Sequence, residues 1–138
     1  MSQEKLLVTD THPLIYFFCD GGRRLSSKAR QAFEEATASP QTSIFVPAPV
    51  LWELSLLVQN DDIQIDKSFS AWIDELVQYP MINPLAFDET TVKLFHNVRY
   101  HTDPFDRAIV ASAIQIGLPL ITNDGMMHRH TPCELFWD

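Results

Sequence analysis

Two acidic residues directly follow short apolar runs with the composition of β-strands. Asp10 ends the run at residues 6–9, and Asp124 follows the run at residues 118–122. In a parallel sheet covered by helices, ligands bind outside the carboxyl ends of the strands, so acids at these points are candidates for a site. An Asx turn or a helix cap explains either residue taken alone equally well, and the sequence leaves that alternative open.

Two further acids, Glu53 and Asp106, lie within segments of helical spacing. Apolar side chains stand three and four residues away from each of them, which places both on a core-facing stripe. Burial disfavours an ionised carboxylate unless a cation or a metal ion pairs with it. The alternatives are a side chain that reaches water or an Arg, or, for Asp106, the third position of a helix capped by Asp103 and begun by Pro104.

The four carboxylates together predict a metal site. Like charges within a few ångströms either take up protons or share a divalent cation, and ligation by oxygen alone suits Mg²⁺ or Mn²⁺ and not zinc. The chemistry expected of such a site is hydrolysis of a phosphodiester. The metal ion lowers the pKa of a bound water and screens the developing charge, so no protein nucleophile is required.

The segments that must position these acids alternate between strand and helix. We expect strands at residues 6–9, 43–46, 81–85, 118–122 and 134–137, and helices at 14–19, 25–38, 48–58, 68–78, 88–98 and 103–116. Alternation of this kind predicts a mainly parallel sheet with helices on both faces, a three-layer α/β/α fold. With 138 residues, no repeat and no long linker, the chain is expected to form one domain over residues 1–138.

Charge limits how this chain can bind nucleic acid. The formal net charge is −8, and residues 61–138 carry twelve acidic against five basic side chains. Such a surface repels phosphate at long range, so nucleic-acid chemistry would need metal ions or a basic partner. The longest apolar run has six residues, and a membrane-spanning helix needs about 20. Without a signal-like start, the protein is expected to be cytoplasmic and not bound to a membrane.

Several other residues have a structural interpretation. Cys19 and Cys133 are expected to be free, buried thiols. The tryptophans Trp52 and Trp72 lie among apolar neighbours, where packing in the core or at an interface is expected. The segment His128-Arg129-His130 is interpreted as a solvated loop.

Four motifs in a fixed order cover nearly the whole chain: LVTDTH at residues 7–12, LWEL at 51–54, DPFDRAIVA at 103–111 and LPLITND at 118–124. With them the sequence resembles a PIN-domain ribonuclease of the VapC-like toxin type. The resemblance implies a PIN-like fold and a metal-dependent endoribonuclease that cuts single-stranded RNA with Mg²⁺ or Mn²⁺. Its implied acidic quartet, which both catalyses and binds metal, is Asp10, Glu53, Asp106 and Asp124.

The resemblance also implies supporting residues and partners. Asp103 is a supplementary acid, and Thr11 and Thr122 match positions near the metal, where a hydroxyl can orient a carboxylate or hold a water. Such proteins are commonly the toxin of a type II toxin-antitoxin pair, so a cognate antitoxin and a homodimer are expected. The acidic stretch at residues 61–66 departs from the basic or glycine-rich turn of related toxins.

Two other functions remain open from the sequence. An aspartate-nucleophile phosphatase would use Asp10, but it needs a second acid two residues later, where His12 stands. His12 itself is assigned no catalytic role, because the Pro13 after it indicates a helix start. A binding module that keeps the fold without catalysis is the other alternative, and metal dependence of cleavage would separate it from the nuclease.

Overall fold

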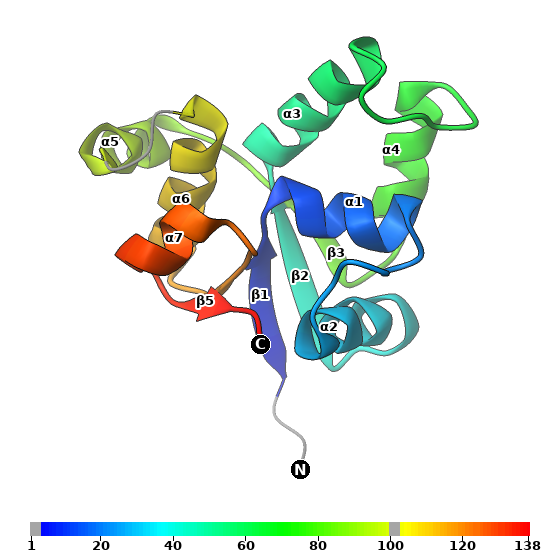
Figure 1. Ribbon diagram of the computed structural model, residues 1–138, viewed down its shortest axis with the longest axis horizontal. Helices are drawn as coiled ribbons and strands as arrows, with labels where there is room; N and C mark the ends of the chain where they lie inside the picture. The colour runs from blue at the N-terminus through cyan, green and yellow to red at the C-terminus, as the bar shows by residue number, and fades with distance from the viewer. Residues whose placement is uncertain (1–3, 100–102) are drawn as a thin grey trace.

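A computed structural model describes residues 4–99 and 103–138 (Figure 1). In chain order its elements are β1 (Lys5–Thr9), α1 (Thr11–Cys19), α2 (Ser27–Ala38), β2 (Thr42–Pro47), α3 (Ala48–Gln59), α4 (Phe69–Val77), β3 (Ile82–Leu85), α5 (Glu89–Asn97), α6 (Pro104–Ile116), β4 (Leu120–Ile121), α7 (Gly125–His130) and β5 (Leu135–Phe136). The predicted alternation of strands and helices is confirmed.

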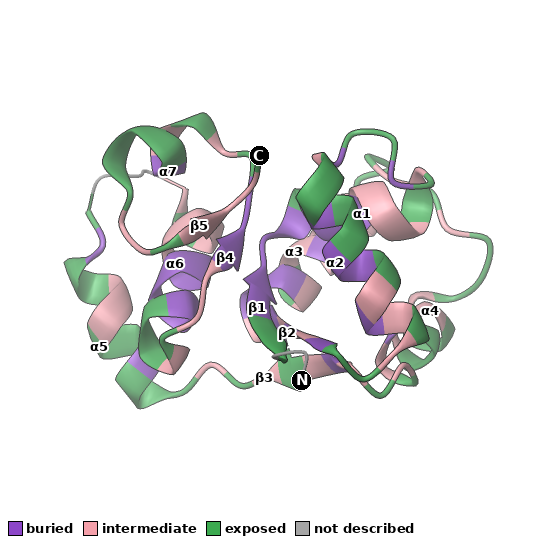
Figure 2. Cartoon of the chain, turned by 90° about the horizontal axis from the view of Figure 1, so that it is seen from below, coloured by how far each residue is buried: buried purple, intermediate pink, exposed green. Residues whose placement is uncertain are grey.

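The strands of the described residues form one parallel sheet in the order β3-β2-β1-β4-β5. Val8 of β1 pairs with Phe45 of β2 on one side and with Leu120 of β4 on the other. Helices α1, α2 and α4 lie on one side of the sheet, and α5, α6 and α7 lie on the other (Figures 1 and 2). The predicted three-layer α/β/α fold is therefore confirmed. The chain reverses its winding direction at β1 and β4, which is where such sheets bind ligands.

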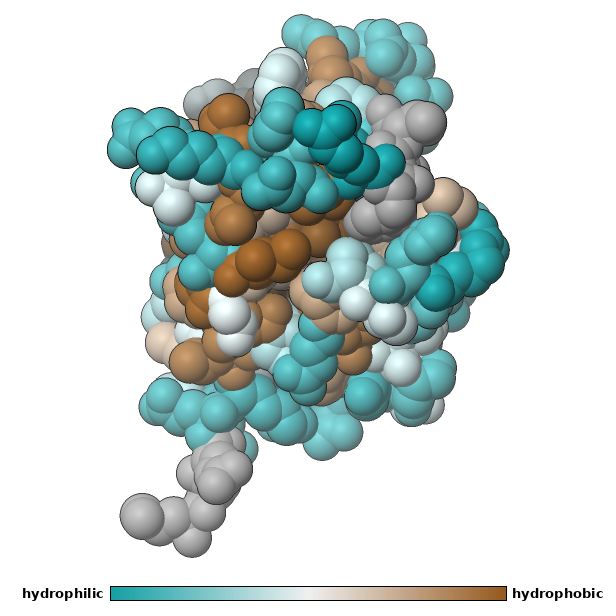
Figure 3. Space-filling view, turned by 90° about the vertical axis from the view of Figure 1, so that its left-hand side faces the viewer, coloured by the Kyte–Doolittle hydropathy of each residue, from teal (hydrophilic) through white to brown (hydrophobic). Residues whose placement is uncertain are grey.

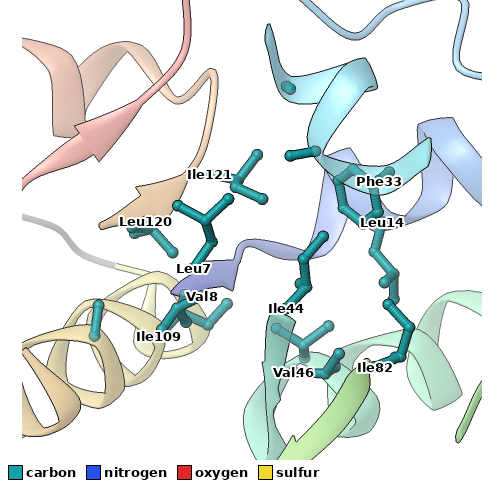
Figure 4. Close-up of a cluster of buried hydrophobic side chains, with 14 of the residues drawn as sticks. Leu7, Val8, Leu14, Phe33, Ile44, Val46, Ile82, Ile109, Leu120 and Ile121 are labelled. Atoms are coloured by element: carbon teal, nitrogen blue, oxygen red, sulfur yellow. The ribbon is translucent and has the colours of Figure 1, made fainter. Parts of the chain in front are cut away.

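The core explains why the strands have continuous apolar runs instead of alternating ones. Leu7 and Val8 are adjacent in β1 and point to opposite faces, and both are buried. Val8 lies beside Ile109 of α6, whereas Leu14 of α1 and Phe33 of α2 meet on the other face (Figure 4). A sheet with both faces covered by helices requires this pattern.

Capping residues fix most of the helix boundaries where they were predicted. The Ser26 and Ser68 hydroxyls accept from backbone N–H groups at the starts of α2 and α4, and Asp88 forms a capping box at the start of α5. Helix α6 ends at Gly117, which adopts the left-handed conformation with φ of 71°.

Three predictions of local structure are wrong. Strand β4 covers only Leu120–Ile121, shorter than the 118–122 expected. The segment around His128 is not a loop but part of α7, a six-residue helix that is too short for periodicity to reveal. The thiol of Cys19 is free but exposed, because the last residue of α1 faces away from the core, and that of Cys133 is only partly buried.

Apolar side chains reach the surface on the side of the sheet that carries α5, α6 and α7 (Figure 3). A hollow of about 580 Å³ lies between α3, α5 and α6 and is lined by apolar residues, among them Trp52, Val92, Phe95 and Phe105. Trp52 is 65% exposed and Val92 50%, so Trp52 is not buried in the core. No helix within residues 4–99 and 103–138 is long and apolar enough to span a membrane.

Candidate active site

A smaller hollow, of about 270 Å³, lies where β1 and β4 end and where α3 and α6 begin. All four predicted acids line it. They come from four separate stretches of the chain, and Asp103 joins them. We call this hollow the acidic pocket; its lining is Asp10, His12, Pro13, Tyr16, Glu53, Asp103, Asp106, Asn123 and Asp124. Five of these lining residues carry carboxyl groups, whereas His12 is the one basic side chain among them.

Asp10 is the most enclosed of the acids, with 5% of its surface exposed. It caps α1, because Oδ1 accepts from the backbone N–H of Thr11 at 2.8 Å. Its other oxygen, Oδ2, accepts from the Thr122 hydroxyl at 2.7 Å. Burial raises the pKa of Asp10, and these two hydrogen bonds partly oppose the rise. Both carboxylate oxygens are thus held in fixed directions.

Glu53 is held by Thr11, the residue whose backbone N–H donates to Asp10. The hydroxyl of Thr11 donates to Oε1 of Glu53 at 2.5 Å, so one residue contacts Asp10 through its backbone and Glu53 through its side chain. Burial is the main reason that the pKa of Glu53 is raised, and the charges of Asp10 and Asp103 raise it further. The predicted core-facing stripe is confirmed, because Pro49 and Val50, one turn earlier in α3, are buried.

Asp106 is another acid of the pocket whose pKa is strongly raised. Burial comes first among its causes, followed by the charges of Asp10, Asp103, Asp124 and Glu53, and together they raise its pKa from 3.8 to about 8. It is also the third residue of α6, whose cap Asp103 accepts from the backbone N–H groups of Phe105 and Asp106 at 2.8 and 3.2 Å. The predicted position of Asp106 at the start of a helix capped by Asp103 is therefore confirmed, and Asp106 also lines the acidic pocket.

Thr122 connects Asp124 to the rest of the acidic pocket. The backbone N–H of Asp124 donates to the Thr122 hydroxyl at 3.0 Å, and that hydroxyl donates in turn to Asp10. Asp124 also caps α7 through the backbone N–H of Met127 at 2.9 Å. The two threonines that the resemblance indicated thus bridge neighbouring acids, Thr11 between Asp10 and Glu53, and Thr122 between Asp10 and Asp124.

Four residues of the pocket wall were not assigned to the site from the sequence: His12, Pro13, Tyr16 and Asn123. Helix α1 begins at Thr11 and not at residue 14, which puts His12 in its first turn beside Asp10. His12 and Tyr16 are four residues apart and therefore lie on one face of α1. An earlier helix start, signalled by Asp10 as a cap, could have revealed them.

The composition of the acidic pocket fits a hard divalent cation. Its donors are carboxylate oxygens, and burial together with their neighbouring negative charges raises the pKa values of Asp10, Glu53 and Asp106. Within the described part of the chain, no three His, Cys, Asp or Glu side chains are already drawn together as metal ligands.

Comparison with known proteins decides the family. Residues 7–131 match the PIN domain, which is most of the chain. This chain belongs to the PIN-domain family. The resemblance drawn from the four sequence motifs is thereby confirmed.

Individual relatives agree with this assignment. The chain is 27% identical to ribonuclease VapC22 of Mycobacterium tuberculosis (strain ATCC 25618 / H37Rv) over 133 residues, which cover 95% of this chain and 98% of that protein. Its fold is similar to that of VapBC2 from Rickettsia felis, solved bound to a DNA fragment from its promoter, with a TM-score of 0.69, 17% identity and coverage of 96% and 99%. A toxin-antitoxin complex from Klebsiella pneumoniae gives a TM-score of 0.60, 22% identity and coverage of 94% and 99%.

Proposed function

We propose that this PIN domain is a metal-dependent endoribonuclease that hydrolyses phosphodiester bonds in single-stranded RNA, with Mg²⁺ or Mn²⁺ as its ion. The observation that carries the proposal is the convergence of Asp10, Glu53, Asp106 and Asp124 on one pocket. PIN-domain ribonucleases generally use a divalent metal ion. The printed name of the M. tuberculosis relative, a ribonuclease, supports the same reaction class.

Each side chain has a role that follows from its contacts. Asp10, Glu53, Asp106 and Asp124 would hold the metal, which when bound supplies an activated water and screens the phosphate charge. Thr122 and Thr11 direct the oxygens of Asp10 and Glu53. Asp103 adds negative charge at the rim and fixes the start of α6, from which Asp106 projects. No residue of the chain is needed as a nucleophile.

The test is cleavage of single-stranded RNA by the purified protein with added MgCl₂ or MnCl₂. Asp10→Asn should abolish cleavage and leave the fold intact, because an amide oxygen can still cap α1 but carries no charge for the metal. The matched control is Asp74→Asn, which removes an exposed carboxylate on α4 that does not line the acidic pocket.

Cleavage that persists in EDTA, or in the Asp10→Asn protein, would contradict the metal mechanism. If the unaltered protein cuts no RNA with either ion, the non-catalytic binding module becomes the better description. Phosphatase activity on small phosphate esters is not expected, because His12 occupies the position of the second acid that such enzymes require.

We also propose that the chain is the toxin of a toxin-antitoxin pair and acts in the cytoplasm, where its RNA substrate is found. Its fold is that of proteins solved as VapBC and other toxin-antitoxin complexes. An acidic pocket and a net charge of −8 suit a partner that inserts a basic side chain, which would form charge-assisted hydrogen bonds with the acids. A small protein encoded beside the gene should suppress cleavage and copurify with the chain.

Self-association is the last part of the proposal. The apolar hollow between α3, α5 and α6 leaves Trp52 and Val92 largely exposed, and apolar surface of this kind is typical of protein interfaces. A second copy of the single domain, residues 1–138, would cover these side chains in a homodimer.

A further inference from the structure

A second hollow adjoins the acidic pocket along α1. It measures about 340 Å³ and runs between α1 and the end of α3. His12 and Tyr16 line both hollows, so the two form one continuous depression with these rings at the boundary. If one phosphate of a polymer lies in the acidic pocket, the adjacent units of the polymer must cross the rim of the pocket. On this side, aromatic side chains form the rim.

The two rings form a surface suited to a flat ligand. His12 is exposed and Tyr16 is half-buried on the same face of α1, with ring centroids 6.2 Å apart and planes inclined by 51°. Aromatic side chains beside a nuclease site bind unpaired bases by stacking, which is tolerant of base identity. Tyr16 packs against the hydrophobic core but stays half-buried, unlike its buried neighbours Leu14 and Ile15, and His12 is exposed.

Arg24 brings a positive charge to the same place. Its guanidinium carbon lies 5.4 Å from the centroid of the Tyr16 ring. Among the described residues that line the two hollows, Arg24 is the one Lys or Arg side chain, and its side chain is 71% exposed. The carboxylate of Asp20 lies 3.7 Å from Arg23 and 3.7 Å from Arg24, so Arg24 shares this carboxylate with a second arginine that lies outside the hollow.

The backbone holds Arg24 in this position. Gly21 and Gly22 adopt left-handed conformations, with φ of 62° and 78°, which turn the chain sharply after α1. The N–H of Gly22 donates to the carbonyl of Tyr16 at 2.7 Å, and the Arg30 guanidinium donates to the carbonyl of Gly22. The loop is therefore tied to α1 at Tyr16 before any ligand binds, which reduces the entropy lost on binding.

We propose that His12, Tyr16 and Arg24 form an RNA track that leads away from the acidic pocket, in which an unpaired base stacks on one of the two rings and contacts the edge of the other, and the guanidinium binds a backbone phosphate. This proposal rests on the proposed ribonuclease function and names positioning residues for it. RNA fits the observations better than a protein segment, because the track presents rings and a cation in line with the pocket, whereas the purely apolar surface of this chain lies elsewhere, at Trp52.

One charge in the second hollow opposes RNA. Asp62, from the turn after α3, also lines it and would repel a phosphate at Arg24. The track therefore predicts that Asp62→Asn tightens RNA binding, by about twofold for an exposed charge in salt.

The experiment measures RNA affinity and turnover separately. Binding of a fluorescein-labelled single-stranded RNA of about 12 nucleotides and mixed sequence is followed by anisotropy with MgCl₂, in the Asp10→Asn background so that no cleavage occurs. His12→Ala, Tyr16→Leu and Arg24→Ala should each weaken binding by about tenfold, the loss expected for a stacked base or a phosphate contact. In the otherwise unaltered enzyme the same changes should raise KM by a similar factor with kcat nearly unchanged.

Matched variants separate the track from general effects. Tyr16→Phe keeps the ring and should retain affinity, whereas Tyr16→Leu keeps only apolar packing, and circular dichroism confirms that both fold. Arg23→Ala removes an equal charge that shares Asp20 but does not line the hollow, so its affinity should stay within about twofold.

Three results would overturn the track. They are unchanged affinity in His12→Ala and Arg24→Ala, equal losses in Arg23→Ala and Arg24→Ala, or loss of affinity in Tyr16→Phe. If RNA affinity is unchanged but these variants no longer bind a copurifying partner protein, the depression is a protein-binding groove. Failure of the unaltered enzyme to cut RNA would instead contradict the ribonuclease proposal, and the anisotropy measurement would still judge the track.

Discussion

Removing the Asp106 charge should stabilise the metal-free protein. In the folded chain the pKa of this carboxyl is about 8, against an ordinary value of 3.8, so the folded state binds its proton more tightly than the unfolded state. The free energy of unfolding must then fall as the pH rises from about 4 to about 8. Asp106→Asn removes this titration, because an amide does not ionise.

The size of the effect follows from the shift and from exposure. Over the roughly three pH units between the ordinary pKa and pH 7, a shift of this kind amounts to about 4 kcal/mol at most, at about 1.36 kcal/mol per unit. The Asp106 side chain is partly exposed, so solvent screening reduces this to about 1–2 kcal/mol.

Urea unfolding in EDTA, followed by far-UV circular dichroism, measures the difference. At pH 7 Asp106→Asn should be more stable than the unaltered protein by about 1–2 kcal/mol. At pH 5 this difference should shrink to about a third, because pH 5 lies only about one unit above the ordinary pKa of 3.8. Saturating Mg²⁺ should stabilise the unaltered protein more than the variant and so narrow the gap.

The exposed Asp74→Asn on α4 serves as the control and should change stability little at either pH. The electrostatic reasoning fails if Asp106→Asn is no more stable than the unaltered protein at pH 7, or if its advantage is the same at pH 5.

Three further changes test other parts of the structure. Thr122→Val removes the hydroxyl that bridges Asp10 and Asp124, so cleavage should drop at least about tenfold and thermal unfolding should show a loss of about 1–2 kcal/mol, whereas Thr122→Ser should restore most of both. Asp103→Asn keeps the cap of α6 and removes only a charge at the rim of the pocket, so its kcat should fall far less than that of Asp10→Asn. An equal fall in kcat would indicate that Asp103 is itself a metal ligand. Val92→Glu places a charge in the apolar hollow and should shift the protein to the 15.8 kDa monomer in light scattering, and a dimer that survives this change would move the interface elsewhere.

The four acids were predictable because each one breaks a pattern that the sequence itself defines. Glu53 and Asp106 stand on stripes of buried apolar residues, and Asp10 and Asp124 stand where strands stop. Helix starts were equally visible, because Ser68 and Asp88 belong to the short list of residues that cap helices. Local rules suffice wherever one residue's type fixes the local geometry.

The residues that were missed depend on contacts between distant segments. Arg24 reaches the edge of the site only because the turn after α1 folds back over Tyr16, and no spacing in the sequence encodes that return. Helix α7 is too short to show a period, and its cap, Asp124, had already been interpreted as a site residue. Thr11 and Thr122 came from the family resemblance, because a buried threonine between two acids has no signature of its own.

Three acids of the pocket also begin helices: Asp10 caps α1, Asp103 caps α6 and Asp124 caps α7. Selection for folding alone would therefore preserve aspartate, or a capping substitute such as asparagine, at these positions after activity had been lost. In a descendant of this gene, the presence of these aspartates would therefore be weak evidence that catalytic activity is retained. Glu53 lies within α3 and caps no helix, so folding does not require it. Its replacement by an apolar residue should therefore appear before replacement of the aspartates in a protein that has lost activity.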